Sequence, residues 1–197
     1  MMKATPTQPR QPAGQIFRHG IIGGLLAGLV FIVAEMIMNA ALGKPFFGPP
    51  RLISSIVLGK AALMPTYSAA KAIIIGFILH FILAMLFGVS TLALFEAARA
   101  VVPRLGASPA MVLLYGAVAG CALWVIDFLI IAPVAFPQFT KVNQFWNGFI
   151  AHTVFFGLVL GGYLVMMVMR PDVRTRAGMR SSGLRSPASQ AGEERTR

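Results

Sequence analysis

Four long stretches of apolar residues dominate the hydrophobic pattern of the chain, and short polar segments separate them. The apolar stretches run over residues 17–42, 69–95, 109–133 and 145–169. Each is longer than the ~20 residues that a helix needs to cross a ~30 Å hydrocarbon core. A segment in lipid must satisfy its own backbone polar groups, which favours helices. The pattern therefore predicts an all-α polytopic membrane protein with four transmembrane helices.

The two ends of the chain lack this apolar pattern. Residues 1–15 are polar and rich in proline, and residues 170–197 are rich in arginine, serine and glycine. Such segments bury too little apolar surface to offset the entropy cost of folding. We therefore predict a disordered N-terminal tail (1–15), a four-helix transmembrane domain (16–169) and a basic disordered C-terminal tail (170–197).

The apolar region contains an internal repeat. Residues that match without a gap lie 92 positions apart: Gly24, Gly28, Glu35, Ala40, Pro45 and Phe47 correspond to Gly116, Gly120, Asp127, Ala132, Pro137 and Phe139. Further along, Gly76 and His80 correspond to Gly148 and His152, 72 positions later. The chain has only three histidines and six acids, so this coincidence of rare residues argues against chance. We infer two tandem two-helix repeats, a principle known from membrane transport proteins.

The first copy contains an insertion of 20 residues, at about positions 49–68, that the second copy lacks. Gly43, Pro45 and Gly48 interrupt the preceding helix. Residues 51–60 then have charged ends and an apolar middle, which predicts a short amphipathic helix. Such a helix either lies in the membrane interface or caps the bundle. A plain connecting role and a gating role are both open.

Small residues recur at four-residue spacing within the predicted spans. Residues four apart share a helix face, and small side chains there let membrane helices approach closely. Glu35 and Asp127 follow their glycines by seven residues, or about two turns, so we expect both acids to face helix contacts. The predicted helix-packing positions are Gly24, Gly28, Gly76, Gly116, Gly120 and Gly148.

The formal net charge of the chain is +11. A charge of this size can indicate nucleic-acid binding, but the basic residues here follow membrane topology. The two tails, the connection between the second and third spans, and Arg18 at the start of the first span together account for twelve of the 17 lysines and arginines. The positive-inside rule then places both termini in the cytoplasm. We therefore expect the lipid bilayer as a partner and no nucleic acid.

The chain carries no signature of a soluble enzyme. It has no glycine-rich phosphate loop, no nucleophile elbow and no His-Glu-x-x-His helix. Cys121 is the only cysteine, which excludes an intramolecular disulfide and a cysteine-based metal motif. The sequence therefore favours a protein that is not an enzyme. Four helices are few for a transporter, so we expect a homo-oligomer or a place in a larger membrane complex.

Two acids and two histidines lie well inside the predicted spans, away from their ends: Glu35, His80, Asp127 and His152. Charged groups in lipid are costly, so such residues are functional candidates. Counted from the helix ends at ~1.5 Å per residue, all four lie roughly 10 to 16 Å below the outer surface. We therefore expect one polar layer in the outer half of the bundle.

Several chemistries fit this layer, and the sequence identifies no cofactor. Two carboxylates and two imidazoles form a ligand set for zinc, iron or manganese, and the same groups suit a proton or ion pathway. Alternatively, His80 and His152 are axial ligands of one haem b, with Glu35 and Asp127 bonded to the outer ring nitrogens. In a further alternative, acid–histidine hydrogen bonds only fasten the helices of an accessory or scaffold subunit.

The layout resembles small four-helix inner-membrane proteins of bacteria, among them the YagU-like group. The shared features are the glycine-rich first helix, the proline-rich outer turns and segment 148–156. The group carries a glycine directly before the last histidine, where this chain has Ala151. The resemblance covers the membrane part and implies a bacterial inner-membrane location. It transfers no catalytic residue.

Overall fold

The computed structural model describes residues 11–140 and 145–168 of the chain. Its helices include four that are long and apolar enough to cross a membrane, over Ala13–Ala41, Ala69–Val101, Pro109–Ala135 and Phe145–Met167. The predicted all-α fold with four membrane-length helices is therefore confirmed. The first helix begins at Ala13, within the segment predicted as the N-terminal tail (1–15), and residues 1–10 of that segment lie outside the described residues. The tail predicted for residues 170–197 lies outside the described residues.

The first two spans are continuous helices, and the last two contain π-helical segments. Helix α1 covers Ala13–Ala41 and helix α3 covers Ala69–Val101. The third span consists of α4 (Pro109–Trp124), the π-helix η3 (Val125–Ile131) and α5 (Ala132–Ala135). The fourth consists of α7 (Phe145–Ile150), the π-helix η4 (Ala151–Leu158) and α8 (Val159–Val168). Because π-helical turns are rare and frequently occur at functional sites, η3 and η4 mark a region of interest.

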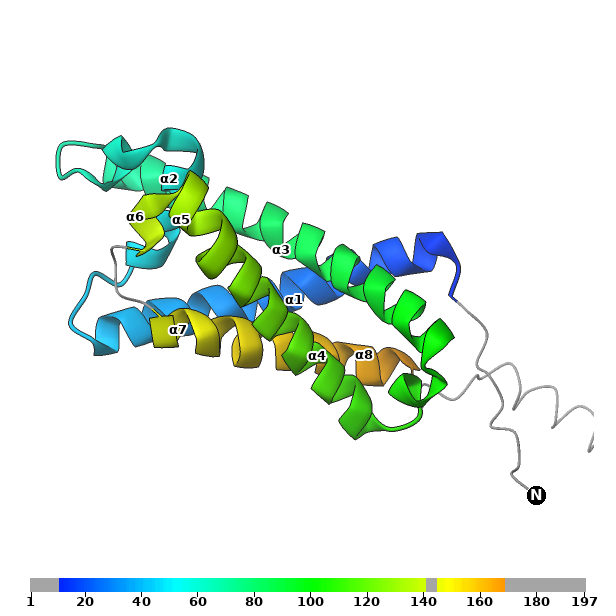
Figure 1. Ribbon diagram of the computed structural model, residues 1–197. Helices are drawn as coiled ribbons and strands as arrows, with labels where there is room; N and C mark the ends of the chain where they lie inside the picture. The colour runs from blue at the N-terminus through cyan, green and yellow to red at the C-terminus, as the bar shows by residue number, and fades with distance from the viewer. Residues whose placement is uncertain (1–10, 141–144, 169–197) are drawn as a thin grey trace, which may run out of the picture.

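Short elements connect the spans at the two ends of the bundle (Figure 1). Helix α2 (Gly48–Leu58), the 3₁₀ helix η1 (Lys60–Leu63) and helix α6 (Pro137–Thr140) lie at one end, which we call the α2 end. The 3₁₀ helix η2 (Pro103–Gly106) lies at the opposite end, with the start of α1 and the end of α8. We call this the η2 end. The short helix expected at residues 51–60 is present as α2.

Local sequence sets several of the helix boundaries. The side chains of Ser68 and Ser108 accept hydrogen bonds from the N–H groups of Lys71 and Met111, and so cap α3 and α4. Gly59 follows α2 with a φ of +69°, a conformation that glycine adopts without steric cost. These signals lie outside the apolar stretches, so the apolar pattern alone left the helix ends uncertain by several residues.

Helices α1 and α3 form a close pair through small residues. A Cβ atom added at Gly88 would lie 2.6 Å from the Cα atom of Gly24, and one added at Gly24 would meet the backbone of Ala84. Real Cβ atoms essentially never make contacts shorter than 3.0 Å. The two backbones therefore approach so closely that only glycine fits at these crossing points.

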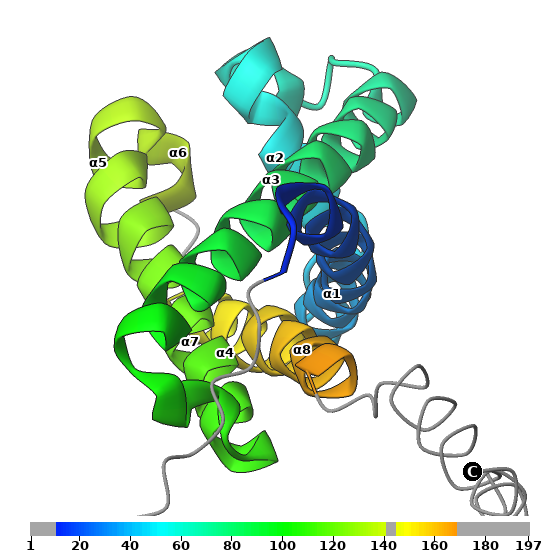
Figure 2. The same ribbon diagram turned by 90° about the vertical axis from the view of Figure 1, so that its right-hand side faces the viewer.

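The third and fourth spans form a second close pair by the same means. A Cβ atom at Gly116 would lie 2.8 Å from the Cα atom of Gly161, and one at Gly120 would lie 3.0 Å from that of Gly157. Contacts between the two pairs run mainly through α1, which packs against η4 and α8. Figure 2 shows α1 and α8 next to each other. The bundle thus consists of two glycine-mediated pairs joined along α1 and the last span.

The interior of the bundle is filled at the η2 end. Leu92 and Phe95 of α3, Val112 of α4 and Leu164 of α8 are fully buried in one apolar cluster. Nearby, the Tyr115 hydroxyl donates a hydrogen bond of 2.9 Å to the carbonyl oxygen of Thr91. This packing leaves space in the interior only toward the α2 end, where the polar candidates lie.

Candidate functional site

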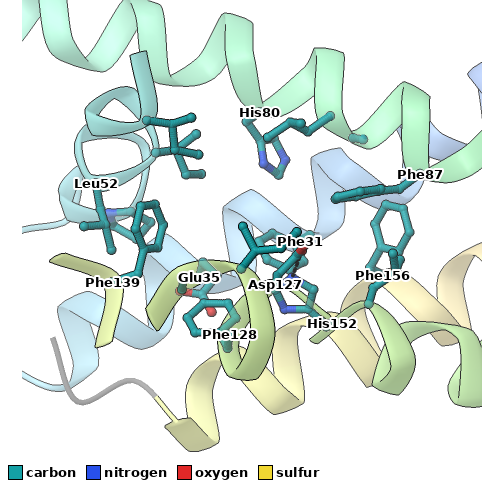
Figure 3. Close-up of a pocket in the computed structure, with 18 of the residues that line it drawn as sticks. Phe31, Glu35, Leu52, His80, Phe87, Asp127, Phe128, Phe139, His152 and Phe156 are labelled. Carbon is teal, nitrogen blue, oxygen red and sulfur yellow. Dashed lines mark ion pairs between the residues drawn. The ribbon is translucent and has the colours of Figure 1, made fainter. Parts of the chain in front are cut away.

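One cavity at the α2 end is lined by all four ionisable residues that the sequence singled out. Glu35 reaches it from α1, His80 from α3, Asp127 from η3 and His152 from η4 (Figure 3). The cavity has a volume of about 360 Å³. Much of the remaining wall is aromatic, with Phe31, Phe87, Phe128, Phe136, Phe139 and Phe156. An apolar cavity with a few convergent polar groups is typical of a small-molecule site.

The inserted helix α2 forms part of the cavity wall. Leu52 and other apolar residues of α2 line the cavity, and so does Phe139 of α6. The buried Gln138 side chain of α6 donates a hydrogen bond of 3.1 Å to the Ser55 hydroxyl of α2. This bond joins two connections that lie far apart in the sequence. Of the roles considered for the insertion, covering the bundle agrees best with this position.

His80 is held by a backbone carbonyl and not by an acid. Its Nε2 atom lies 2.8 Å from the carbonyl oxygen of Gly28 on α1. A carbonyl oxygen only accepts hydrogen bonds, so Nε2 carries a proton and Nδ1 is the acceptor of the neutral ring. The bond from His80 to Glu35 that two of the alternatives require is absent from the described contacts. Glu35 lies seven residues beyond Gly28, about 10 Å further along α1.

His152 has both a backbone partner and an acidic partner. Its Nδ1 atom donates a hydrogen bond of 2.7 Å to the carbonyl oxygen of Gly148, one turn earlier. Its Nε2 atom lies 3.6 Å from Oδ2 of Asp127. Because Asp127 is on η3 and His152 on η4, this contact connects the third and fourth spans. It agrees with the alternative in which acid–histidine contacts fasten the helices.

Glu35 is the most buried of the four groups that has no hydrogen bond from another described residue. It is only 6% exposed, and among the described residues no hydrogen bond reaches its carboxyl group. His152 and Lys44 are the ionisable groups that act on it electrostatically. A carboxyl group buried without a hydrogen-bond partner is costly as an anion. Protonation or a bound cation would therefore stabilise it.

Phe31 separates the two histidines. Its ring centroid lies 5.4 Å from that of His80 in a stacked arrangement and 4.8 Å from that of His152 in an edge-on arrangement. Figure 3 shows the Phe31 side chain between the two imidazoles. The two histidines therefore cannot hold one haem from opposite faces while Phe31 stays in place. Their outer nitrogens are also held by glycine carbonyls, where the haem hypothesis required Glu35 and Asp127.

The four groups line a common cavity without converging on one point. In residues 11–140 and 145–168, no three His, Cys, Asp or Glu side chains form a group that could hold a metal ion. The geometry gives no support to a metal bound by Glu35, His80, Asp127 and His152 together. The contacts that do form are pairwise, and they involve backbone carbonyls as well as side chains.

Comparisons with known proteins return no match. No protein-family model, no curated protein and no solved structure is similar to this chain. The function must therefore be argued from the cavity and from the chemistry of the residues that line it.

The six predicted packing glycines have two kinds of neighbour. Gly24 and Gly28 lie against α3, and Gly116 and Gly120 lie against the fourth span. Gly76 instead lies under α2, where an added Cβ atom would meet the backbone of Pro50. At Gly148 an added Cβ atom would lie 3.4 Å from side-chain atoms of both Phe128 and Trp124. These last two positions therefore shape the surroundings of the cavity and not a helix crossing.

The sequence interpretation overlooked the aromatic residues of the site. Phe31 contacts both histidines, and Phe128 lies edge-on to His152 with a centroid distance of 5.6 Å. Apolar residues in a membrane helix carry little positional signal, because lipid and protein interior are both apolar. Spacing offered a usable signal for Phe31. It lies three residues after Gly28 and four before Glu35, which places it on the same helix face.

Proposed function

We propose that this protein is an integral protein of the bacterial inner membrane that binds a small amphiphilic molecule in its intramembrane cavity and handles protons there. The observation that carries the proposal is the cavity lining, which combines four ionisable groups with six phenylalanine rings. Polar groups in such a site fix the orientation of a ligand, and the apolar wall binds its body. The basic tails support a cytoplasmic location of both termini, and the YagU-like resemblance supports the inner membrane.

Proton handling is supported by the atoms of the four groups that can still accept a proton. Nδ1 of His80, Nε2 of His152 and the carboxyl groups of Glu35 and Asp127 can each take up a proton. The apolar cluster of Leu92, Phe95, Val112 and Leu164 fills the η2 end and separates these groups from that side. The arrangement therefore favours a one-sided binding site over an open ion channel.

The two helix pairs also support the tandem repeat, which we include in the proposal. Gly24 meets Ala84 and Gly88 in the first pair, and Gly116 meets Gly157 and Gly161 in the second. His80 precedes Ala84 by four residues, whereas His152 precedes Gly157 by five. The π-helix η4 lies over this longer spacing, and its wider turn accommodates an additional residue.

A second candidate function is that of an accessory or scaffold subunit in a homo-oligomer or larger membrane complex. A specific observation favours it, because two polar contacts fasten helices to one another. His80 joins α3 to α1 through the Gly28 carbonyl, and His152 joins η4 to η3 through Asp127. In that case the cavity would remain empty and the polar groups would contribute only to stability.

Ligand binding is tested with three compounds that share a 4-phenylbutyl group and differ in their polar head group. The protein is reconstituted in lipid nanodiscs, and empty nanodiscs serve as the blank. We expect saturable binding of at least one of 4-phenylbutylamine, 4-phenylbutanol and 4-phenylbutyrate. Ile56→Trp adds an indole to the cavity wall and should abolish this binding. Ile78→Trp is the matched control, because Ile78 is 57% exposed on α3 and does not line the cavity. Failure of all three probes to bind would overturn the proposed function.

The two candidate functions differ in what the polar residues do for stability. His80→Leu breaks the bond between α3 and α1, so we expect the free energy of unfolding in detergent to fall by about 0.6–1.7 kcal/mol. Glu35→Gln removes no hydrogen bond with another described residue and replaces a buried acid by a neutral amide, so stability should not fall. Denaturation in mixed micelles measures both values. If Glu35→Gln is as destabilising as His80→Leu, Glu35 is a fastening residue and the scaffold function gains support.

A further inference from the structure

We propose that the ligand of the cavity is a lipophilic ammonium compound, an organic cation with N–H donors beside an apolar or aromatic body. This inference rests on the proposed function, since it requires that the cavity binds a small molecule. It goes further because it assigns the charge and the hydrogen-bonding character of that molecule. Three features of the site carry it.

The first feature is that the polar groups of the cavity are acceptors. The Nε2–H of His80 is used by the Gly28 carbonyl, and the Nδ1–H of His152 is used by the Gly148 carbonyl. A neutral imidazole has one donor and one acceptor, so each ring has only a lone pair left. Carboxylates also accept only. A ligand that supplies hydrogen-bond donors therefore fits this set, whereas a carbonyl compound or an anion finds a donor in it only after one of the four groups has taken up a proton.

The second feature is the position of negative charge. Glu35 is buried without a hydrogen bond from another described residue, so a bound cation would stabilise its carboxylate. Asp127 and Nε2 of His152 are two acceptors that face each other at 3.6 Å, and one proton between them makes them an ion pair. An ammonium hydrogen can take the place of that proton. Both acids thus complement an N–H cation better than a neutral ligand.

The third feature is the aromatic wall. The negative face of an aromatic ring attracts a cation that lies within about 6 Å of its centroid. Phe31 and Phe128 both contact His152, which places aromatic rings beside the acceptor groups. The other four phenylalanines add to the apolar wall of the same cavity. A compound with a charged head and an apolar body therefore matches the two parts of the cavity.

The test compares four ligands that share the 4-phenylbutyl body. They are the primary amine, the trimethylammonium derivative, the alcohol and the carboxylate 4-phenylbutyrate. The primary amine is protonated at neutral pH, as a lysine side chain is. Since charge-assisted hydrogen bonds and cation–π contacts both favour it, we expect the amine to bind roughly tenfold more tightly than the alcohol. The trimethylammonium ligand has the charge without donors and should lie between them, and the carboxylate should bind least.

Variants identify the group that recognises the cation. Glu35→Gln should reduce the affinity for the amine roughly tenfold and leave the affinity for the alcohol nearly unchanged. Ile78→Trp on the exposed face of α3 should alter neither affinity. If the alcohol or the carboxylate binds as tightly as the amine, the ammonium assignment is wrong, while the binding cavity itself stands. If no probe binds, the proposed function fails as well.

An ammonium group can belong to a free amine or to the head group of an aminolipid. Nanodiscs of phosphatidylglycerol contain no ammonium group, and addition of phosphatidylethanolamine supplies one. Competition between phosphatidylethanolamine and 4-phenylbutylamine would identify the lipid head group as the source. Undiminished binding of the amine would identify a free compound. Both results support recognition of ammonium, and weak amine binding in both compositions contradicts it.

Discussion

Gly88→Ala should destabilise the bundle by about 1–3 kcal/mol or more, the cost of forcing additional atoms into a packed interior. The added Cβ atom would lie 2.6 Å from the Cα atom of Gly24 and 2.8 Å from its amide nitrogen. Both neighbours are backbone atoms, so no side chain can rotate away to make room. Helices α1 and α3 would have to separate. Thermal or chemical denaturation in detergent should show a large loss of stability from a single methyl group.

The chain offers a matched control for this substitution. A Cβ atom at Gly162 on α8 would meet no other atom within 4 Å. Gly162→Ala should therefore leave stability unchanged or raise it slightly, because alanine has the higher helix propensity in general. Equal stability of the Gly88→Ala and Gly162→Ala proteins would contradict the close approach of α1 and α3.

The helix pairs were largely predictable from the sequence, because glycine has a clear meaning in a membrane span. Gly24 and Gly28 lie at four-residue spacing, and their partners Ala84 and Gly88 do so too. Such stripes permit close backbone contact, and lipid-facing positions have no need of them. The sequence could not tell which stripe meets which. Gly76 lies on the same stripe of α3, yet it contacts α2 and not another span.

The polar residues were identified correctly as inward-facing, but their individual partners were not. Acid–histidine pairing was one of the alternatives for both histidines, and among the described contacts it occurs between Asp127 and His152. His80 uses the carbonyl of Gly28, where the missing side chain leaves the backbone accessible. Residue types do not reveal such side-chain to backbone contacts. Similarly, the π-helical turns of η3 and η4 arise from packing, and the hydrophobic pattern does not reveal them.

The sequence left open whether the helix at residues 51–60 caps the bundle or lies in the membrane interface, and the position of α2 over the cavity leads to a second large effect. Gly76→Ala would place a Cβ atom 3.1 Å from the Cα atom of Pro50 and much closer to its carbonyl group. These are backbone atoms of α2, so the overlap is relieved only if α2 moves away from α3. The movement would open the cavity wall that Leu52 and its neighbours form. The substitution should therefore weaken probe binding as well as local stability.

A buried position on α2 reports this movement directly. Ser54 is fully buried, and its hydroxyl contacts only the carbonyl of Arg51 within the same helix, so Ser54→Cys is a mild change. In a Cys121→Ala background this thiol should be protected from maleimide. Gly76→Ala overpacks the contact between α2 and α3 at a cost of about 1–3 kcal/mol. The exposed state of the thiol should become more populated by the corresponding factor, which accelerates labelling roughly 5- to 150-fold. Gly14→Ala is the control, because its Cβ atom would meet nothing within 4 Å. Protection that persists in the Gly76→Ala protein would contradict the close contact between Gly76 and Pro50, from which the expected movement of α2 is derived.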